Sequence, residues 1–291
     1  MEEKKLNLRV EGSLVMRCKD HSVSGEIFEL RKAEPYDLMY TFPVPDADSL
    51  AKYYKSSKYI SHTNSKNSFR EKLYHLVRNL MLRQKLRWIN KMAPGKTSLL
   101  DIGAGTGHFV SEASKVGWDA EGVEPNPDAR RVAAESGVML RDNLESLRPG
   151  KFDVITMWHV LEHVSDLEGQ LTLLDDLLAE HGLLIIAVPN YKSWDAQKYG
   201  PNWAAFDVPR HLYHFSRKSI REIFGEVGFV VVQEKGLFFD PWYVSLLSES
   251  YLGNPFPLFK AMLQGLRSTM QAWRTGEHSS VVYFIRRRDS K

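Results

Sequence analysis

The chain has 291 residues, of which 43% are hydrophobic and 26% are charged, and its formal net charge is +3. These values are ordinary for a soluble globular protein, and so small a net charge gives no sign of a nucleic-acid partner. The single cysteine, Cys18, excludes an internal disulfide and fits a reducing compartment. The first ten residues lack the apolar core of a secretory signal, and no segment has the ~18 to 20 uninterrupted apolar residues of a membrane span. We therefore expect a cytoplasmic protein without stable membrane insertion.

The first 67 residues are expected to form an extension with short strands. Alternating apolar residues within 1–40 predict these strands, and the two prolines and two aspartates of 41–49 are typical of a linker. Residues 51–67 are polar but rich in tyrosine, which leaves two interpretations. The segment is either a surface helix and loop whose tyrosines pack on the core, or a lid over a ligand pocket, for which an apolar ring with a polar tip is suited. If the segment is a lid, Tyr54, Tyr59 and His62 are expected to contact the substrate.

Residues 68–92 have apolar side chains at helical spacing, and Ser68 with Glu71 forms a capping-box pattern, so an amphipathic helix is predicted there. From Leu99 onward strand-like and helix-like segments alternate, which predicts an α/β fold with a mostly parallel seven-stranded sheet and helices on both faces. The expected helices are 108–116, 127–136, 167–180 and 217–227. The expected strands are 99–102, 120–124, 138–141, 152–160, 183–189, 229–234 and 280–287.

A glycine-rich stretch, LLDIGAGTGHF, occupies residues 99–109. A buried strand there would lead into a tight turn, where glycine accepts positive φ and keeps no Cβ between the backbone and a ligand. The following helix would aim its first N–H groups at that ligand. The dinucleotide fingerprint G-x-G-x-x-G fails by one residue, because His108 stands where its third glycine belongs.

The acid-x-Gly-x-Gly-x-Gly pattern that is present resembles motif I of the class I S-adenosylmethionine (SAM)-dependent methyltransferases. The resemblance implies a Rossmann-like fold, SAM as cofactor and S-adenosylhomocysteine as its product. It also implies that the loop passes under the methionine part of the cofactor. The residues implied in this contact are Asp101, Gly103, Ala104, Gly105, Thr106 and Gly107.

Two later turns are candidates for the rest of the cofactor. Glu124 ends the second strand, and an acid about 20 residues after a glycine loop can accept both ribose hydroxyls, although it could instead cap the helix that begins at Pro127. Pro125 would lie beside it. In the resembled family the turn after the third strand meets the adenine ring, which implicates Asn143 and Leu144, and an ordinary Asx-turn is the alternative.

The segment FDVITMWHVLEHV, residues 152–164, closely resembles the fourth-strand segment of methyltransferases related to the ubiquinone-pathway O-methyltransferases. The resemblance implies that Trp158 and His159 line the cofactor pocket, with Glu162 and His163 near the entering acceptor. H-x-x-E-H is also the zinc pattern of inverted zincins, but that pattern requires a helix and this one follows a strand-like run, so no metal is expected.

A third segment, WAAFDVPRHLYHFS at residues 203–216, resembles one found in a subgroup of methyltransferases, many of them uncharacterised or acting on sugars and other small molecules. It is expected to border the acceptor pocket, with an Asp207–Arg210 structural ion pair as the alternative. Relatives in this subgroup often have an N-terminal zinc ribbon. Here only Cys18 and His21 remain, too few ligands for structural zinc, so the N-terminal region is expected to be metal-free.

The expected organisation is an extension (1–67), a SAM-binding core (68–239), an aromatic insertion covering the acceptor (240–275) and a final strand (276–291). The alternative for the insertion is that its aromatic residues are ordinary core. The expected activity is O- or C-methylation of a sugar, quinone-like or lipid-like acceptor, which an apolar roof over the site would suit, with contact to a membrane surface compatible with such a substrate. The alternatives are a non-catalytic SAM-binding protein and an NAD-linked Rossmann oxidoreductase. A hydroxyl acceptor needs a base, and the candidates are His163, His211 and His214. The further substrate contacts expected are Trp203, Asp207, Arg210 and Trp242.

Overall fold

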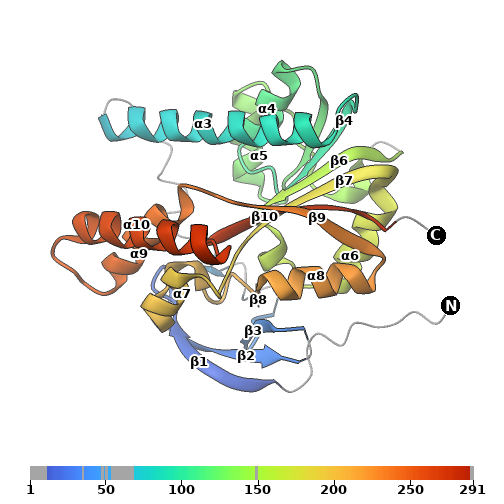
Figure 1. Cartoon of the computed structure of the whole chain (residues 1–291). Helices are drawn as coiled ribbons and strands as arrows, with labels where there is room; N and C mark the ends of the chain where they lie inside the picture. The colour runs from blue at the N-terminus through green and yellow to red at the C-terminus, as the bar shows by residue number, and fades with distance from the viewer. Residues whose placement is uncertain are drawn as a thin grey trace. The chain divides into compact units, whose positions relative to one another are not determined.

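The computed structural model describes residues 12–34, 36–46, 49, 52–53, 69–147 and 150–288, and side chains of the long helix from residue 77 onward. The chain divides into two compact units, which are described separately (Figure 1). The first unit contains residues 1–56, 159–171 and 186–284, and the second contains 57–158, 172–185 and 285–291. The expected segments were continuous stretches of the chain, whereas each unit combines three stretches that are far apart in the sequence.

The second unit contains the glycine-rich stretch. Helix α3 (Phe69–Met92) precedes β4 (Ser98–Ile102), which pairs in parallel with β5 (Asp119–Val123) and β6 (Phe152–Trp158). Helix α4 (His108–Lys115) follows β4, and α5 (Pro127–Glu135) follows β5. The apolar residues of β4 are fully buried, as expected for a central parallel strand with both faces covered.

Six strands, rather than the expected seven, form the main sheet of the described residues. Their order is β5-β4-β6-β7-β10-β9. The additional elements are β7 (Leu178–Pro189), β9 (Phe229–Gly236) and β10 (Ser280–Arg287), with α6 (Leu167–Leu177) before β7 and α8 (Arg217–Glu226) before β9. The expected strand at 138–141 was wrong: it contributes a single parallel bridge between Arg141 and Val123. Met139 within it is 82% exposed, so this edge segment gains little burial from longer pairing.

The first unit contains an antiparallel sheet in the order β1-β2-β3-β8. Its strands are β1 (Ser13–Lys19), β2 (Ile27–Ala33), β3 (Leu38–Phe42) and the two-residue β8 (Tyr213–His214). In β8, Tyr213 pairs with Tyr40 and His214 with Met39. The expected strands near 13–17 and 26–30 are present, whereas the one at 6–10 lies outside the described residues. The pairing of the 203–216 segment with the N-terminal strands was not foreseen.

The 240–275 insertion is a pair of helices, α9 (Asp240–Tyr251) and α10 (Pro257–Thr275), in the first unit (Figure 1). Small side chains face inward along α10, and a Cβ added at Gly265 would come within 2.9 Å of the Trp242 ring. Glycine is therefore required where the two helices touch. Among the described residues, no helix has both the length and the apolar character needed to cross a bilayer.

Candidate functional site

The glycine loop of the second unit is a chain of left-handed turns. Gly103, Gly105 and Gly107 have φ values of 72°, 54° and 74°, which side-chain-bearing residues adopt at a cost. A Cβ at Gly107 would approach Val138 Cγ1 to 2.9 Å, whereas one at Gly105 would meet no atom within 4 Å. The loop therefore leaves open space beside Gly105, as a site for a ligand close to the backbone requires.

Glu124 is tied to this loop rather than to the following helix. Its Oε2 accepts the backbone N–H of Gly105 at 2.8 Å, and its Oε1 accepts that of Asn126 at 2.9 Å. Asn126 caps α5 through its own side chain, so the alternative in which Glu124 is the helix cap was wrong. Pro125 is exposed beside it. The carboxylate is partly exposed, and its remaining lone pairs can still accept hydroxyl groups.

Asp101 lies at the end of β4 and is buried. Its Oδ1 accepts a hydrogen bond from Thr156 Oγ1 at 2.6 Å. Burial raises the pKa of Asp101 to about 7 and the nearby charge of Glu124 adds to this, against the opposing effects of the Thr156 bond and the Lys85 ammonium. A carboxyl with this pKa can hold or release a proton near neutral pH.

Trp158, at the end of β6, forms the floor of an aromatic and cationic stack. The Lys85 ammonium lies 3.9 Å above its ring centroid, and Phe109 meets it edge-on at 5.7 Å. Lys85 belongs to α3. The sequence did not predict its role, because a lysine in a helix has the same pattern whether it contacts solvent or the end of a strand. Asn143 is exposed and accepts the Ser146 N–H, which is the Asx-turn interpretation, and Leu144 begins the short helix η2 (Leu144–Ser146). A contact of either residue with adenine stays a prediction.

His159 follows Trp158 directly and begins the part of the motif in the first unit. Its φ is 56°, and its ring is held by Glu162 Oε1 at 3.3 Å and by Asp240 Oδ2 at 3.1 Å. Burial opposes charge on the ring, but the two carboxylates outweigh it and raise the pKa of His159 to about 10. His159 is therefore an imidazolium clamped between two acids, and it lies outside any helix, unlike the first ligand of an inverted zincin.

Glu162 and His163 lie in the short helix η3 (Leu161–His163), where they meet His211 from the 203–216 segment. One ligand atom from each of these three side chains lies within 4.8 Å of the other two, and the two imidazole rings are 4.6 Å apart and nearly perpendicular. Glu162 is 1% exposed, and its Oε2 has no hydrogen-bond partner among the described residues. The sequence pattern did not foresee this cluster, and its donor set could hold a divalent metal ion.

Backbone carbonyls fix the tautomers of both histidines. His163 Nδ1 lies 3.0 Å from Arg210 O, and His211 Nδ1 lies 2.9 Å from Ala205 O. Because a carbonyl oxygen only accepts, each Nδ1 carries a proton, and in the neutral form of either ring the lone pair is on Nε2. Burial and then the neighbouring His211 lower the pKa of His163 to about 4, so that ring is neutral at physiological pH.

His214, the third candidate base, is not part of this cluster and is hydrogen-bonded to Thr41 of β3. Thr41 Oγ1 donates to His211 O at 2.6 Å, and it therefore accepts from His214 Nε2 at 3.0 Å. The pKa of His214 is lowered well below its usual value, first by burial and then by His211. Its position is that of a neutral packing histidine in the antiparallel sheet.

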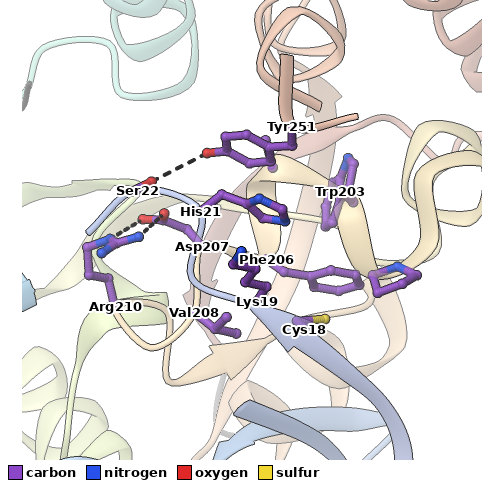
Figure 2. A pocket seen from close by; sticks show the side chains of 12 residues that line it. Cys18, Lys19, His21, Ser22, Trp203, Phe206, Asp207, Val208, Arg210 and Tyr251 are labelled. Atoms are coloured by element: carbon purple, nitrogen blue, oxygen red, sulfur yellow. Dashed lines mark hydrogen bonds and ion pairs between the residues drawn. The ribbon is translucent and has the colours of Figure 1, made fainter. Parts of the chain in front are cut away.

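Asp207 and Arg210 form the structural ion pair that was the alternative for this segment. Arg210 Nε and Nη2 donate to the Asp207 carboxylate at 2.9 and 2.6 Å, and Nη2 also reaches Asp20 Oδ1 at 3.1 Å. Asp20 in turn accepts backbone N–H groups of the β1–β2 turn. Figure 2 shows this ion pair at the wall of a small cavity that Trp203, His21 and Tyr251 also line. At about 10 Å³ this cavity suits a single water rather than an acceptor.

The other expected acceptor contacts have different positions. Trp203 is buried and donates its ring N–H to Asp195 Oδ2 at 2.8 Å. Trp242 packs on Gly265 of α10. The expected contacts Tyr54, Tyr59 and His62 lie outside the described residues.

Comparison with known proteins decides the family. A family model described as a methyltransferase domain matches residues 69–234, more than half of the chain. The chain belongs to this methyltransferase family. It is a class I SAM-dependent methyltransferase, and S-adenosylmethionine is its cofactor. The alternatives of an NAD-linked oxidoreductase and a non-catalytic binding protein are thereby set aside.

Individual relatives of this methyltransferase are distant. A ubiquinone biosynthesis O-methyltransferase from Cereibacter sphaeroides is 29% identical over 165 residues, which cover 51% of this chain and 67% of that protein. One from Burkholderia pseudomallei is 26% identical over 175 residues, covering 54% and 75%. The crystal structure of magnesium protoporphyrin IX methyltransferase from Synechocystis with bound S-adenosylhomocysteine has a TM-score of 0.53 at 15% identity, covering 83% of this chain and all of that one. The structural likeness establishes the α/β methyltransferase fold.

Proposed function

We propose that this enzyme transfers the methyl group of SAM to a hydroxyl oxygen of a small-molecule acceptor. The observation that carries the proposal is the meeting of Glu162, His163 and His211, where the hydrogen bonds of both Nδ1 atoms leave Nε2 as the proton-accepting nitrogen of each ring. The names of the similar ubiquinone biosynthesis O-methyltransferases support an oxygen acceptor. A sugar, quinone-like or lipid-like molecule remains the proposed acceptor class, and C-methylation is the second candidate because a base would also serve a carbon acid.

The reaction is an in-line displacement. The acceptor oxygen attacks the sulfonium methyl carbon, the C–S bond breaks, and its electron pair stays on sulfur to give S-adenosylhomocysteine. The hydroxyl proton passes to an imidazole Nε2. Positioning the oxygen ~3 to 3.5 Å from the methyl carbon supplies much of the rate.

We assign proton acceptance to His211. Burial and the neighbouring His211 lower the pKa of His163 to about 4, which makes that ring a poor proton acceptor. The Glu162 carboxylate beside them stabilises the imidazolium that forms on His211. His214 is the least favoured of the three candidate bases, because its Nε2 is engaged with Thr41.

Asp207 and Arg210 act in this proposal as positioning residues. The Arg210 carbonyl orients the His163 ring, and the Asp207 carbonyl accepts the His211 backbone N–H at 3.1 Å. The cofactor contacts proposed are Asp101, the 103–107 loop, Glu124, Pro125, Asn143, Leu144, Trp158 and His159. Trp203 and Trp242 are proposed to shape the acceptor side through packing, and Tyr54, Tyr59 and His62 remain proposed contacts.

The test is a pH–rate comparison of the wild type, His211→Gln and His163→Gln, with hydroxyl acceptors and detection of the methyl ether by mass spectrometry. Loss of a general base lowers kcat by roughly 10²- to 10⁴-fold while KM for SAM is unchanged. His181→Gln, at an exposed histidine, is the control. An assay after chelation, with zinc or magnesium restored, separates proton acceptance by His211 from metal binding by the same three side chains. A His211→Gln enzyme with wild-type kcat would contradict the assignment.

A further inference from the structure

The outward face of α10 presents a stripe of large apolar side chains to solvent. Residues 259, 262, 266, 270 and 273 follow one another at intervals of three or four, which places them on one side of the helix. Phe259 is 73% exposed and Trp273 is 71% exposed. The exposed large apolar residues of this helix are Leu258, Phe259, Met262, Leu263, Leu266, Met270 and Trp273.

The buried face of the same helix is made of small or polar residues. Ala261, Gly265, Ser268 and Ala272 face inward, and Gly265 packs on Trp242 of α9. This arrangement is the reverse of an ordinary surface helix, which turns its large apolar residues toward the core. An exposed apolar surface of this kind marks an interaction site.

Cations flank the stripe. Lys260, Arg267 and Arg274 are all exposed, and their spacing of seven residues aligns them along one side of the helix, next to the apolar residues. Helix α10 contains no aspartate or glutamate. The two acids of α9 are engaged elsewhere: Asp240 pairs with His159, and the buried Glu249 accepts a hydrogen bond from Tyr199. The charged side chains exposed on α9 and α10 are therefore cationic.

We propose that this face of α10 docks on an anionic phospholipid surface. Aromatic and aliphatic side chains beside a line of lysine and arginine are what a helix needs to lie in the headgroup region of a membrane. Each cation near such a surface gains favourable interaction with anionic lipid. Leu252 and Phe256, exposed between the two helices, extend the apolar surface at the same end as Leu258 and Phe259.

Charge argues against a second copy of the chain as the occupant. A two-fold contact through this face would bring together two lines of cations with no acid on either α10 to pair with them. Anionic headgroups would neutralise those cations. The apolar stripe can lie in the headgroup region of a membrane, and this does not require a helix that crosses the bilayer. The acceptor chemistry of the active site is not needed for this inference.

The experiment is sedimentation of the full chain with vesicles of phosphatidylcholine alone and of phosphatidylcholine mixed with phosphatidylglycerol. The wild type is expected to sediment with the anionic vesicles and to be released as salt rises. The pair Phe259→Ser and Trp273→Ser should lower the partition coefficient by at least roughly tenfold. Arg267→Gln with Arg274→Gln should lower it roughly tenfold on anionic vesicles only.

The pair Val230→Ser and Val232→Ser is the matched control, because these side chains are exposed on β9 and lie outside α10. Each variant is checked for its melting temperature and for S-adenosylhomocysteine binding, which should equal those of the wild type. Vesicle binding that persists in the α10 variants would overturn the proposal, as would failure of the wild type to bind. Light scattering that shows a dimer dissociated by Phe259→Ser would assign the face to self-association instead.

Discussion

Gly105 donates its backbone N–H to Glu124 Oε2 at 2.8 Å, so the glycine loop and the acid that follows β5 are one hydrogen-bonded unit. Glu124 also accepts the Asn126 N–H, and its carboxylate is thus fixed before any ligand arrives. A pre-positioned acceptor binds hydroxyl groups with less loss of side-chain entropy.

Glu124→Gln should weaken S-adenosylhomocysteine binding by roughly tenfold, because an amide offers one acceptor oxygen where the carboxylate offers two. The measurement is titration calorimetry. A ligand analogue that lacks both ribose hydroxyls should bind the wild type and the variant equally. Asp128→Asn, at an exposed acid of the next helix, serves as the control. Equal loss for the analogue would place the role of Glu124 in loop structure alone.

Three glycine variants separate strain from ligand contact. Gly105→Ala and Gly117→Ala both place an alanine at positive φ with no atom within 4 Å of the new Cβ, so each should lose about 1 to 2 kcal/mol of unfolding free energy. Only Gly105→Ala should also lose S-adenosylhomocysteine affinity. Gly107→Ala should lose more stability than either, because its Cβ would meet Val138. Denaturant unfolding measures the stability of each variant, and calorimetry measures its affinity for S-adenosylhomocysteine. If Gly105→Ala kept the wild-type affinity, the ligand would not lie beside Gly105.

Arg210→Met should destabilise the protein by about 3 to 5 kcal/mol, since it leaves the Asp20 and Asp207 carboxylates without their shared cation. Arg17→Met is the control. It removes an exposed pair with Glu29, and it should change the unfolding free energy by less than about 1 kcal/mol. Urea unfolding of both variants measures the difference. Similar losses in the two would show that burial of the Arg210 network contributes little.

The clamped His159 predicts a loss of stability at alkaline pH. Its pKa in the folded protein is about 10 against an ordinary 6.5, so its contribution is complete below about pH 6.5 and disappears as the pH rises toward 10. The unfolding free energy of the wild type should therefore fall across this range more steeply than that of His159→Gln. If the unfolding free energies of the two proteins changed in parallel with pH, His159 could not be an imidazolium in the folded protein.

His163 predicts a loss of stability at acidic pH. Its pKa of about 4 lies below the ordinary 6.5, so the unfolded chain takes up a proton that the folded chain refuses between these values. Stability from this group is complete above about pH 6.5 and is lost as the pH falls toward 4. The difference in unfolding free energy between the wild type and His163→Gln, measured from about pH 7 to 4, should shrink on acidification. A constant difference would contradict a buried neutral His163.

Local sequence signals predicted the second unit well. The strand before the glycine loop, the helix after it and the strand ending at Trp158 lie within two residues of the expected bounds. Each has a clear hydrophobic pattern, and a glycine stands just after the first strand, just after the helix and shortly before the strand that ends at Trp158. The expected strand at 138–141 failed because it lies at a sheet edge, where apolar residues such as Met139 stay exposed and pairing is decided by few contacts.

The acceptor side was less predictable, because its geometry depends on pairs remote in sequence. The motif identified Glu162, His163 and His211 as separate residues, but only the fold brings them together. Asp240 and Asp20 were missed because an acid in an insertion or in a turn resembles any solvated acid until its partner is known. Spacing likewise gave no means to separate His211 from His214, which differ in their hydrogen-bond partners: the Ala205 carbonyl for His211 and the Thr41 hydroxyl for His214.

The pairing of β8 with β3 joins residues far apart in the chain: Thr41 and His214, which share a hydrogen bond, are 173 positions apart. Such contacts close a very long loop, which costs chain entropy and slows folding. During synthesis, β3 must remain without this neighbour until Tyr213 and His214 have left the ribosome. The segment that holds His211 is therefore expected to order after the local β1–β2 pairing has formed, and a kinetic probe placed there should report a slower phase than a probe on β1 and β2.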